Sequence, residues 1–548
     1  MLSLGERVKR YLTFASGIFE CIGFAGAIFG WASLVFVLKE EGYFRNLCIS
    51  PHNASEPGGS NGTVDCYLQD ERFALIFTMA SFMDSFTTLP GGYIFDRFGT
   101  MPAQFMAISM YTTGTLLVAF STAASAVLLF PAACLLAVGG GTFYISNMQV
   151  GNLFGDRRST VITLYNGAFA SSSCAFLLVK VLYQAGFSVR SIFLFISSMS
   201  IVHVLRVLFL LPRKTIPYPL PEDYTYGITC TRFGSDSSSC EEETARQMKP
   251  LRVENEADVE MDKRPENKQW EVEEKEEKME PTDHFNIQTK PSTGTDVKMD
   301  KVRSFRSCIF SRLFATHLMW ISVLQLRHYL FIGTLNPMLM LMSHGDTTEV
   351  SKYTNAFALT QICGFFCAPW NGIVMDWLQQ TDKTSKAVSD SVVSKRLAGM
   401  RSAVVSLIIT ITQCVLFSIS ATIPILEVQY VSFILQVINH SFLYGGDAAF
   451  ISIVYPSCHF GKIYGVGQTL SAFISLLQYP CFALIQGPLN NNPLFVNIGF
   501  IVLVILTYTH PLNLYLHWRQ ELQQSRTKQN PQAGVKIQGD ELTKDTDV

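Results

Sequence analysis

The sequence GGYIFDRFG, residues 91–99, ends a long apolar run with an acidic and a basic residue side by side. Its Gly92, Asp96, Arg97 and Gly99 have the spacing G-x-x-x-D-R-x-G. The glycine allows a second helix to approach closely, the aspartate marks the membrane edge, and the arginine can reach a neighbouring helix end or acid. We expect these four residues to form a conformational latch in a protein with two states.

Half of this pattern recurs in NGIVMDW, residues 371–377. Gly372 and Asp376 repeat the glycine-to-aspartate spacing, while Trp377 replaces the arginine. Gly92 and Gly372 lie 280 residues apart, each near the end of the second apolar run of its half of the chain. A motif repeated at this distance indicates two related halves. We therefore assign Gly372 and Asp376 to the latch as well.

The composition predicts a polytopic, all-α membrane protein. Only 16% of the 548 residues are charged, against about 25% in soluble domains. A membrane-spanning helix needs about 20 mostly apolar residues. Twelve runs meet this need: 11–38, 73–95, 101–121, 125–149, 160–184, 191–212, 312–341, 353–377, 400–421, 428–454, 461–487 and 494–517.

The runs divide the chain into four parts. We expect a six-helix bundle over 1–212 with an outer loop at 39–72, a second bundle over 307–518, and a disordered tail over 519–548. Between the bundles, 213–306 is rich in charge and poor in apolar residues, and such a segment buries too little surface to order itself. It is therefore predicted to be a largely disordered linker.

Basic residues predict the orientation, because they gather on the cytoplasmic side. A cytoplasmic N-terminus leaves nine basic residues in the short inner loops and five in the outer ones. Twelve spans then place the C-terminus and the linker inside too. The first outer loop holds the glycosylation sequons of Asn53 and Asn61, which implies the secretory pathway and the plasma membrane. Cys48 and Cys66 bracket the sequons, and we expect them to form a disulfide.

Other classes of function find no support in the sequence. The net charge of −2 argues against nucleic acid as a partner. No G-x-S-x-G, H-E-x-x-H or Walker-type phosphate loop indicates an enzyme. No cysteine–histidine spacing indicates a metal, and we expect no cofactor.

Several stretches, which include the latch sequence FDRFG, resemble one family. The sequences GFAGAIFGWASLVFVLKEEGYF, LFGDRRSTVITLYNGAFASSS, LRHYLFIGTLNPML and SFLYGGDAAF look like solute carrier family 43 of the major facilitator superfamily. That family includes large neutral amino acid transporters and a nucleobase transporter, and residues 17–44, 165–173 and 328–336 look most like the latter. The resemblance implies facilitated, sodium-independent transport of adenine, guanine and hypoxanthine. We expect the transporter to be a monomer.

The first apolar run holds three candidates for a substrate site. Glu20, Phe24 and Trp31 share one helical face by their spacing. The carboxylate can accept hydrogen bonds from purine N–H groups while an aromatic ring covers a face of the base. An ionisable residue in mid-span is a functional candidate by default. Three roles for Glu20 stay open: substrate acceptor, ion-pair partner of Arg327, or proton site.

The seventh run is the counterpart of the first in the other half. Gln325, His328 and Asn336 fall on one side of it, and their amide and imidazole groups suit the edge of a purine. Arg327 points the other way and needs a partner within the membrane. The candidates for this partner are Glu20, Asp84 and Asp447, and the sequence favours none of them.

Three further polar residues are candidates for facing the substrate, one from each of three other runs: Asn166, Gln361 and Tyr444. Two alternatives stand beside the purine interpretation. Arg327 and Glu20 would together suit a zwitterion, which favours a large neutral amino acid as substrate. The long linker would instead suit a receptor or scaffold that transports nothing and recruits partners.

Overall fold

The computed structural model describes residues 4–48, 66–217, 220–221, 224–226, 304–384, 392–456 and 459–529. Within these ranges the regular structure is entirely helical. The described helices belong to one compact unit, formed by residues 1–228 and 302–548. Most of the predicted linker, residues 229–301, lies outside the described ranges.

The helices follow the apolar runs closely. In the first half they are α1 (Leu4–Glu20), α2 (Trp31–Glu40), α3 (Tyr67–Phe86), α4 (Thr88–Phe98), α5 (Thr100–Phe120), α6 (Leu129–Met148), α7 (Arg158–Ser171), α8 (Cys174–Gln184), α9 (Val189–Ser198) and α10 (Ser200–Leu210). In the second half they are α12 (Phe305–Ile309), α13 (Arg312–Met342), α14 (Thr347–Ile362), α15 (Gly364–Thr384), α16 (Val392–Thr422), α17 (Val428–Val454), α18 (Phe460–Ser475), α19 (Gln478–Gln486), α20 (Leu494–Leu506) and α21 (Thr509–Gln529).

Fewer than twelve of these segments qualify as spans by length and apolar character. In the described part of the chain nine helices qualify, and two pairs joined at a bend raise the number to eleven. The remaining predicted run, 428–454, forms the single helix α17. Its polar side chains lower its mean hydropathy, and several of them are buried against other helices: Gln429, Gln436, Asn439, His440 and Asp447.

The first span is broken near its middle. α1 ends at Glu20, a π-helical turn (Cys21–Ala25) follows, and the chain bends by 45° before α2 continues the span. Gly26 lies at this bend, and its backbone N–H donates to Ser172 Oγ at 2.7 Å. A Cβ at Gly26 would lie 2.6 Å from that same oxygen, so the close approach requires glycine. The counterpart span, α13, runs unbroken for 31 residues.

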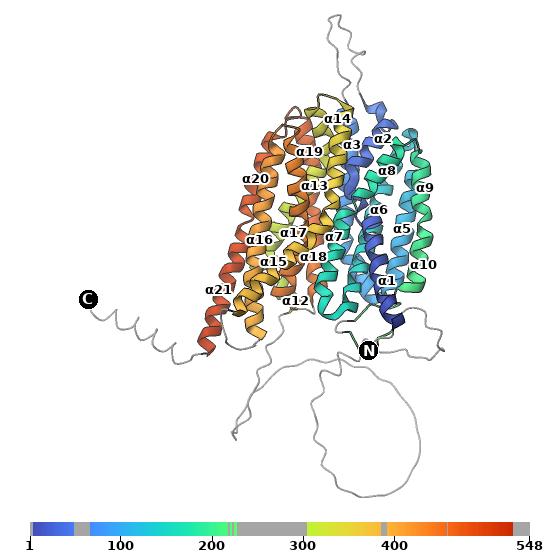
Figure 1. Ribbon diagram of the computed structural model, residues 1–548. Coiled ribbons are helices and arrows are strands. Elements are labelled where there is room, and N and C mark those ends of the chain that lie inside the picture. The colour runs from blue at the N-terminus through green and yellow to red at the C-terminus, as the bar shows by residue number, and fades with distance from the viewer. Residues whose placement is uncertain are drawn as a thin grey trace, which may run out of the picture. The chain divides into compact units, whose positions relative to one another are not determined.

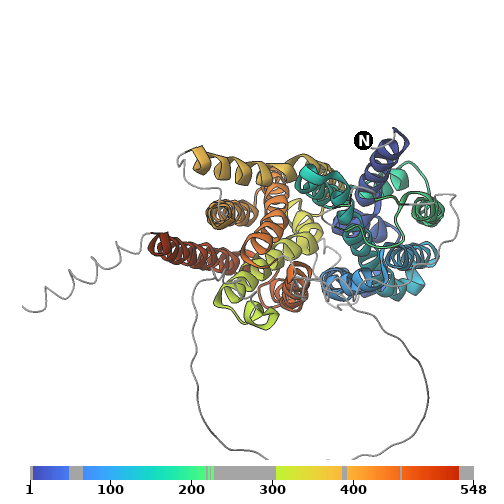
Figure 2. The same cartoon turned by 90° about the horizontal axis from the view of Figure 1, so that it is seen from below.

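The two halves of the chain lie beside each other. Figure 1 shows the blue-to-green helices of the first half next to the yellow-to-red helices of the second, and the view from below in Figure 2 separates the same two groups. Across the boundary α7 packs against α15, α3 against α18, and α2 against α13. Residues that line this boundary are therefore the natural candidates for a shared site.

Each of the two predicted bundles extends beyond its expected C-terminal end. The first residues of the predicted linker pack against the first half: Thr100 Oγ1 donates to the carbonyl of Lys214 at 3.0 Å, and Ile216 is buried. Gly99, with φ of +89°, accommodates this segment, since a Cβ there would lie 2.7 Å from the carbonyl oxygen of Arg213. At the other end, α21 continues to Gln529 rather than ending near 518.

Candidate functional site

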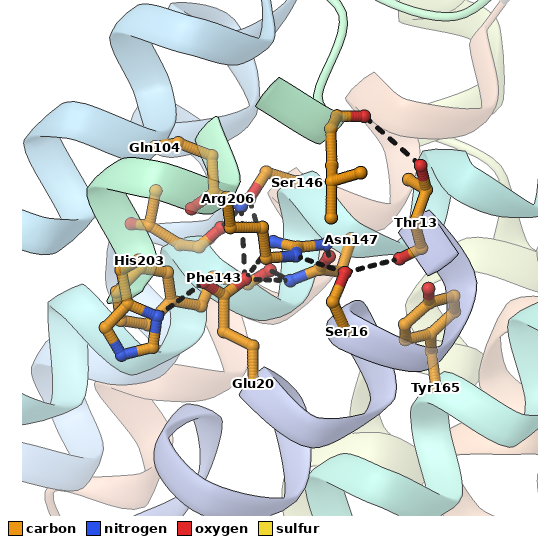
Figure 3. A network of polar contacts seen from close by, with 12 residues as sticks. Thr13, Ser16, Glu20, Gln104, Phe143, Ser146, Asn147, Tyr165, His203 and Arg206 are labelled. Carbon is orange, nitrogen blue, oxygen red and sulfur yellow. Dashed lines mark hydrogen bonds and ion pairs between the residues drawn. The ribbon is translucent and has the colours of Figure 1, made fainter. Parts of the chain in front are cut away.

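Glu20 lies in a buried polar network inside the first half (Figure 3). Arg206 of α10 donates to the Glu20 carboxylate at 2.5 Å, and His203 of the same helix contacts the second carboxylate oxygen at 2.8 Å. Asn147 of α6 donates to Glu20 at 2.6 Å and accepts from Arg206 at 2.5 Å. Gln104 of α5 adds a longer contact of 3.4 Å. Four helices thus meet at one compensated charge pair.

This network overturns one of the three roles left open for Glu20, the ion pair with Arg327. The partner of Glu20 is Arg206, which the sequence interpretation missed. The signal was available, because His203 and Arg206 are two ionisable residues one helical turn apart in an apolar run. With His203, Asn147 and Arg206 around it, the Glu20 carboxylate faces the inside of its own half.

Arg327 has surroundings of a different kind in the second half. Its Nε donates to Ser418 Oγ at 3.2 Å. Its guanidinium lies 4.9 Å from the ring centre of Phe417, 5.9 Å from that of Phe331 and 6.0 Å from that of Phe500. Among the described residues no carboxylate pairs with it. Aromatic rings therefore hold this cation, and the three acids considered as its partner lie elsewhere.

Asp447 is the compensated acid of the second half. His317 of α13 contacts one carboxylate oxygen at 2.8 Å, and Gln468 of α18 donates to the other at 2.7 Å. His317 in turn contacts His510 of α21 at 3.3 Å. Each half thus contains one buried acid whose two oxygens are occupied by side chains of that same half.

Where the halves meet, aromatic and polar side chains gather into what we call the central cluster. Phe29 stacks on Tyr329 across the boundary, with ring centres 5.8 Å apart and planes 23° apart. Phe169 and His440 each present an edge to Phe29. Five residues come from each half: Phe29, Asp84, Tyr144, Asn166 and Phe169 from the first, and Gln325, Tyr329, His440, Tyr444 and Tyr464 from the second.

Half of the central cluster keeps some exposed surface although it lies between the halves. The partly exposed members are Asp84, Tyr144, Asn166, Tyr444 and Tyr464. These side chains are therefore open to a water-sized molecule. The cluster contains no lysine and no arginine, so its hydrogen-bonding groups are amides, phenols, one imidazole and one carboxylate. Such a set suits an uncharged, flat, polar solute.

Three of the nine predicted substrate residues belong to the central cluster. Asn166 accepts a hydrogen bond from Tyr144. Gln325 donates to Ser85 at 2.9 Å and to Tyr329 at 2.7 Å, and therefore joins the two halves. Tyr444 presents its ring to His440 with centres 4.9 Å apart. Contact of these three with substrate stays a prediction; Asn166 and Tyr444 are partly exposed, whereas Gln325 is fully buried.

Five of the other six lie away from the cluster, and His328 lies at its edge, where its ring meets that of His440. Phe24 packs edge-on against His203 beside Glu20, and Trp31 stacks on Phe77 of α3. The remaining three make buried contacts with partners outside the cluster: His328 with Asn439 at 2.8 Å, Asn336 with the carbonyl of Ala32 at 2.7 Å, and Gln361 with Gln436 at 2.7 Å. Helical spacing groups residues by face, but it does not show which neighbouring helix that face meets.

Comparison with known proteins agrees with this architecture. Residues 21–478 match the family model described as Major Facilitator Superfamily. The chain belongs to the Major Facilitator Superfamily. It is a multi-pass membrane transporter of small molecules and not an enzyme.

The chain is similar in sequence to two kinds of transporter. It is 46% identical over 506 residues to equilibrative nucleobase transporter 1 of Bos taurus, which covers 92% of the chain and 95% of the relative. It is 27% identical over 553 residues to large neutral amino acids transporter small subunit 3 of Homo sapiens, which covers 94% and 95%. These are the two classes of relative that the sequence predicted, so the resemblance is confirmed.

The latch residues of this transporter are placed differently from the prediction. Arg97 is exposed and donates to Tyr93 of its own helix at 2.7 Å, rather than to a neighbouring helix or acid. A Cβ at Gly92 would meet nothing within 4 Å, so Gly92 does not serve a close helix approach. Gly372 is similarly open, with its nearest neighbour at 4.0 Å. The side chains of Asp96 and Asp376 lie outside the described set.

The outer loop of the transporter is described only at its ends. Cys48 and Cys66 form the predicted disulfide. Gln69 of α3 donates to the carbonyl of Tyr43 at 2.7 Å, which ties the start of the second span to the end of the first. Asn53 and Asn61, the predicted glycosylation sites, lie outside the described residues.

Proposed function

We propose that this transporter carries purine nucleobases, such as adenine, guanine and hypoxanthine, down their gradient across the plasma membrane without sodium. The observation that carries the proposal is the 46% identity to a nucleobase transporter over nearly the whole of both chains. The relatives named for amino acids stand at 27% and 25%. Identity on this scale favours the nucleobase as the substrate class.

The central cluster supports the same substrate. A purine offers two flat faces and an edge of hydrogen-bond donors and acceptors. Phe29 and Tyr329 supply aromatic faces from opposite halves, and Asn166, Gln325 and Tyr444 supply polar groups beside them. Stacking of a base on an aromatic side chain contributes about 1–3 kcal/mol. We propose that substrate binds between these residues.

We also propose the topology in which this site works. Twelve spans, with α17 as the one that falls short in hydropathy, form two six-helix halves over 1–212 and 307–518. Both termini, the linker 213–306 and the tail 519–548 face the cytoplasm, while Asn53 and Asn61 are glycosylated outside. The halves rock about the central cluster to give alternating access. The latch residues Gly92, Asp96, Arg97, Gly99, Gly372 and Asp376 then act in another state of that cycle.

The second candidate substrate is a large neutral amino acid, which the 27% relative favours. A zwitterion needs a cation for its carboxylate and an acid for its ammonium group. The pair first considered for this task is separated in the structure, because Glu20 is held by Arg206 in one half and Arg327 by aromatic rings in the other. The central cluster offers an acid but no cation, so it supports the purine.

Uptake of radiolabelled adenine into transporter-poor cells tests the proposal. Expression of the chain should raise the initial rate several-fold. Replacement of sodium by choline, or addition of a proton ionophore, should leave the rate unchanged. Excess hypoxanthine should block uptake and excess leucine should not, and the opposite pattern of competition would refute the proposal in favour of the amino acid.

A separate variant addresses the receptor or scaffold alternative. Deletion of residues 229–301 should leave adenine uptake intact if that segment only connects the two halves. A scaffold that transports nothing would instead show no adenine uptake above background with or without the segment. Surface biotinylation of both proteins provides the control for delivery to the membrane.

A further inference from the structure

Three acidic residues lie in the interior of the described spans, and only one of them has no partner. Both carboxylate oxygens of Glu20 accept hydrogen bonds within the first half, and both of Asp447 do so within the second. The carboxylate of Asp84, in α3, receives no hydrogen bond and no ion pair from any described residue. A lone carboxylate inside a membrane protein marks a functional position.

The surroundings of Asp84 leave room for its carboxylate. Gly141 of α6 lies directly opposite, and a Cβ at that position would come within 2.8 Å of Asp84 Oδ1. Part of the Asp84 surface stays exposed. Four phenol groups lie within electrostatic reach of the carboxylate: Tyr144, Tyr329, Tyr444 and Tyr464. Because Tyr144 comes from the first half and the other three from the second, Asp84 faces the boundary between the halves.

An unpaired carboxylate at this place needs a donor that the protein does not supply. Phe29 and Tyr329 stack on each other across the boundary, and the Tyr329 phenol lies within electrostatic reach of Asp84. Every purine base carries an imidazole N–H, at N9 or N7, in addition to its other edge groups. A nucleoside or an N9-alkylated base has replaced that hydrogen by carbon. A site that hydrogen-bonds an N–H rejects an analogue that lacks it, because the acceptor is then left buried and unpaired.

We propose that Asp84 accepts the imidazole N–H of the purine and thereby selects free bases over their N9-substituted derivatives. This inference rests on the proposed function and names the group that sets its specificity. It replaces Glu20 as the acidic acceptor, because the Glu20 carboxylate is occupied by Arg206, His203 and Asn147. The substrate N–H completes the hydrogen bonding of this carboxylate.

The wild-type protein provides the first test. Adenine, 9-methyladenine and 7-methyladenine are compared as competitors of radiolabelled adenine uptake. Since a base without the N–H leaves the Asp84 acceptor unpaired, both methylated bases should compete at least about tenfold more weakly than adenine. Equal competition by all three would overturn the inference and leave the proposed function standing. Absence of adenine uptake by the wild type would instead overturn the proposed function itself.

Variants then assign the discrimination to Asp84. Asp84→Leu removes the acceptor while it keeps the branched shape of the side chain, and it should raise the KM for adenine about tenfold or more. The inhibition constant of 9-methyladenine should change little. The ratio of that inhibition constant to the KM for adenine should therefore approach one. Asp84→Asn keeps an oxygen acceptor without the charge and should lie between Asp84→Leu and the wild type. An Asp84→Leu protein that reaches the surface and keeps the wild-type ratio would refute the assignment.

Two further variants separate recognition from a general effect on the helix. Asp70→Asn removes a carboxylate from the outer end of the same helix, where Asp70 pairs with Lys39, and should preserve the wild-type ratio. Gly141→Ala should push the Asp84 carboxylate aside and lower the ratio without removing the acid. If the Asp84 variants fail to reach the surface, the methylated bases still test the need for the N–H, and Gly141→Ala still tests its assignment to Asp84.

Discussion

At the scale of single residues, partners inside the protein decide which polar groups are free for a substrate. Glu20 and Asp447 are acids in apolar helices, yet each has both oxygens occupied within its own half. Asp84 has no such partner, and Phe29 stacks across the boundary rather than within one half. The sequence shows that a charge lies in a span, but only the assembled structure shows which charge lacks a partner.

The charge pair of the first half should behave as a structural element. Removal of one partner from a buried pair leaves an uncompensated charge and costs about 3–5 kcal/mol. Arg206→Leu should therefore lower the thermal stability of the detergent-solubilised protein, measured by a fluorescence unfolding assay. The double variant Glu20→Gln with Arg206→Leu should recover part of the loss.

Arg97→Gln serves as the control for this pair, because Arg97 is an exposed arginine that contacts only its own helix turn. It should leave the melting temperature unchanged. If Arg206→Leu were as stable as this control, the buried pair would contribute nothing to the fold.

The aromatic stack between the halves should contribute directly to affinity. Phe29→Ala removes a ring that stacks on Tyr329, and loss of about 1–3 kcal/mol of stacking should raise the KM for adenine about 5- to 150-fold. Phe19→Ala is the matched control, since Phe19 lies on the same span but is 63% exposed. Equal effects of the two substitutions on KM would argue against a stacking role for Phe29.

At the scale of elements, the helices themselves were predictable and their breaks were not. Each of the twelve apolar runs coincides with helix in the structure, because length and hydropathy determine where a helix lies in a membrane. The break after Glu20 depends on contacts with other segments, such as the bond from Gly26 to Ser172 in the turn between α7 and α8. The candidate substrate residues were grouped by helical face. Six of the nine lie outside the central cluster, because helical spacing does not show which neighbouring helix a face meets.

Glycines in the helices differ in how closely a neighbouring helix approaches them, and this difference gives a prediction at the scale of elements. A Cβ at Gly140 of α6 would lie 2.1 Å from the carbonyl oxygen of Ala25, whereas one at Gly92 would meet nothing within 4 Å. Gly140→Ala should therefore destabilise the protein by about 1–3 kcal/mol through overpacking. Gly92→Ala should be tolerated.

Surface abundance and thermal unfolding of the two glycine variants in parallel provide the measurement. Equal tolerance of both would mean that the broken first span shifts freely away from α6. A loss of surface abundance or stability confined to Gly92→Ala would support a close helix approach at the latch in another state of the cycle.

At the scale of the whole molecule, polar contacts join the halves well away from the latch. Gln184 of α8 donates to Ser351 of α14 at 3.3 Å, and Lys180 donates to the carbonyl of the same serine at 3.1 Å. Tyr479 donates to Glu71 at 2.6 Å. In the proposed topology these contacts lie toward the outer ends of the spans, so the halves must separate here when the site opens outward.

A covalent link at this point should stop transport. The variant Gln184→Cys with Ser351→Cys, treated with a short thiol-reactive crosslinker, should lose most of its adenine uptake. A cleavable reagent should allow uptake to recover on reduction. Each single variant under the same treatment provides the control for modification of the native cysteines. Full activity of the crosslinked double variant would contradict alternating access by relative movement of the halves.

The pairing of Glu20 with Arg206 also has an electrical consequence. The membrane potential acts only on net charge that moves through its field, at about 2.3 kcal/mol per elementary charge per 100 mV. Since the two opposite charges are held 2.5 Å apart in one half, they move together and contribute no net charge displacement. A change in membrane potential would therefore exert no net force on this network. An Arg206→Leu protein would instead contain an unbalanced negative charge, and its transport rate would acquire a dependence on voltage.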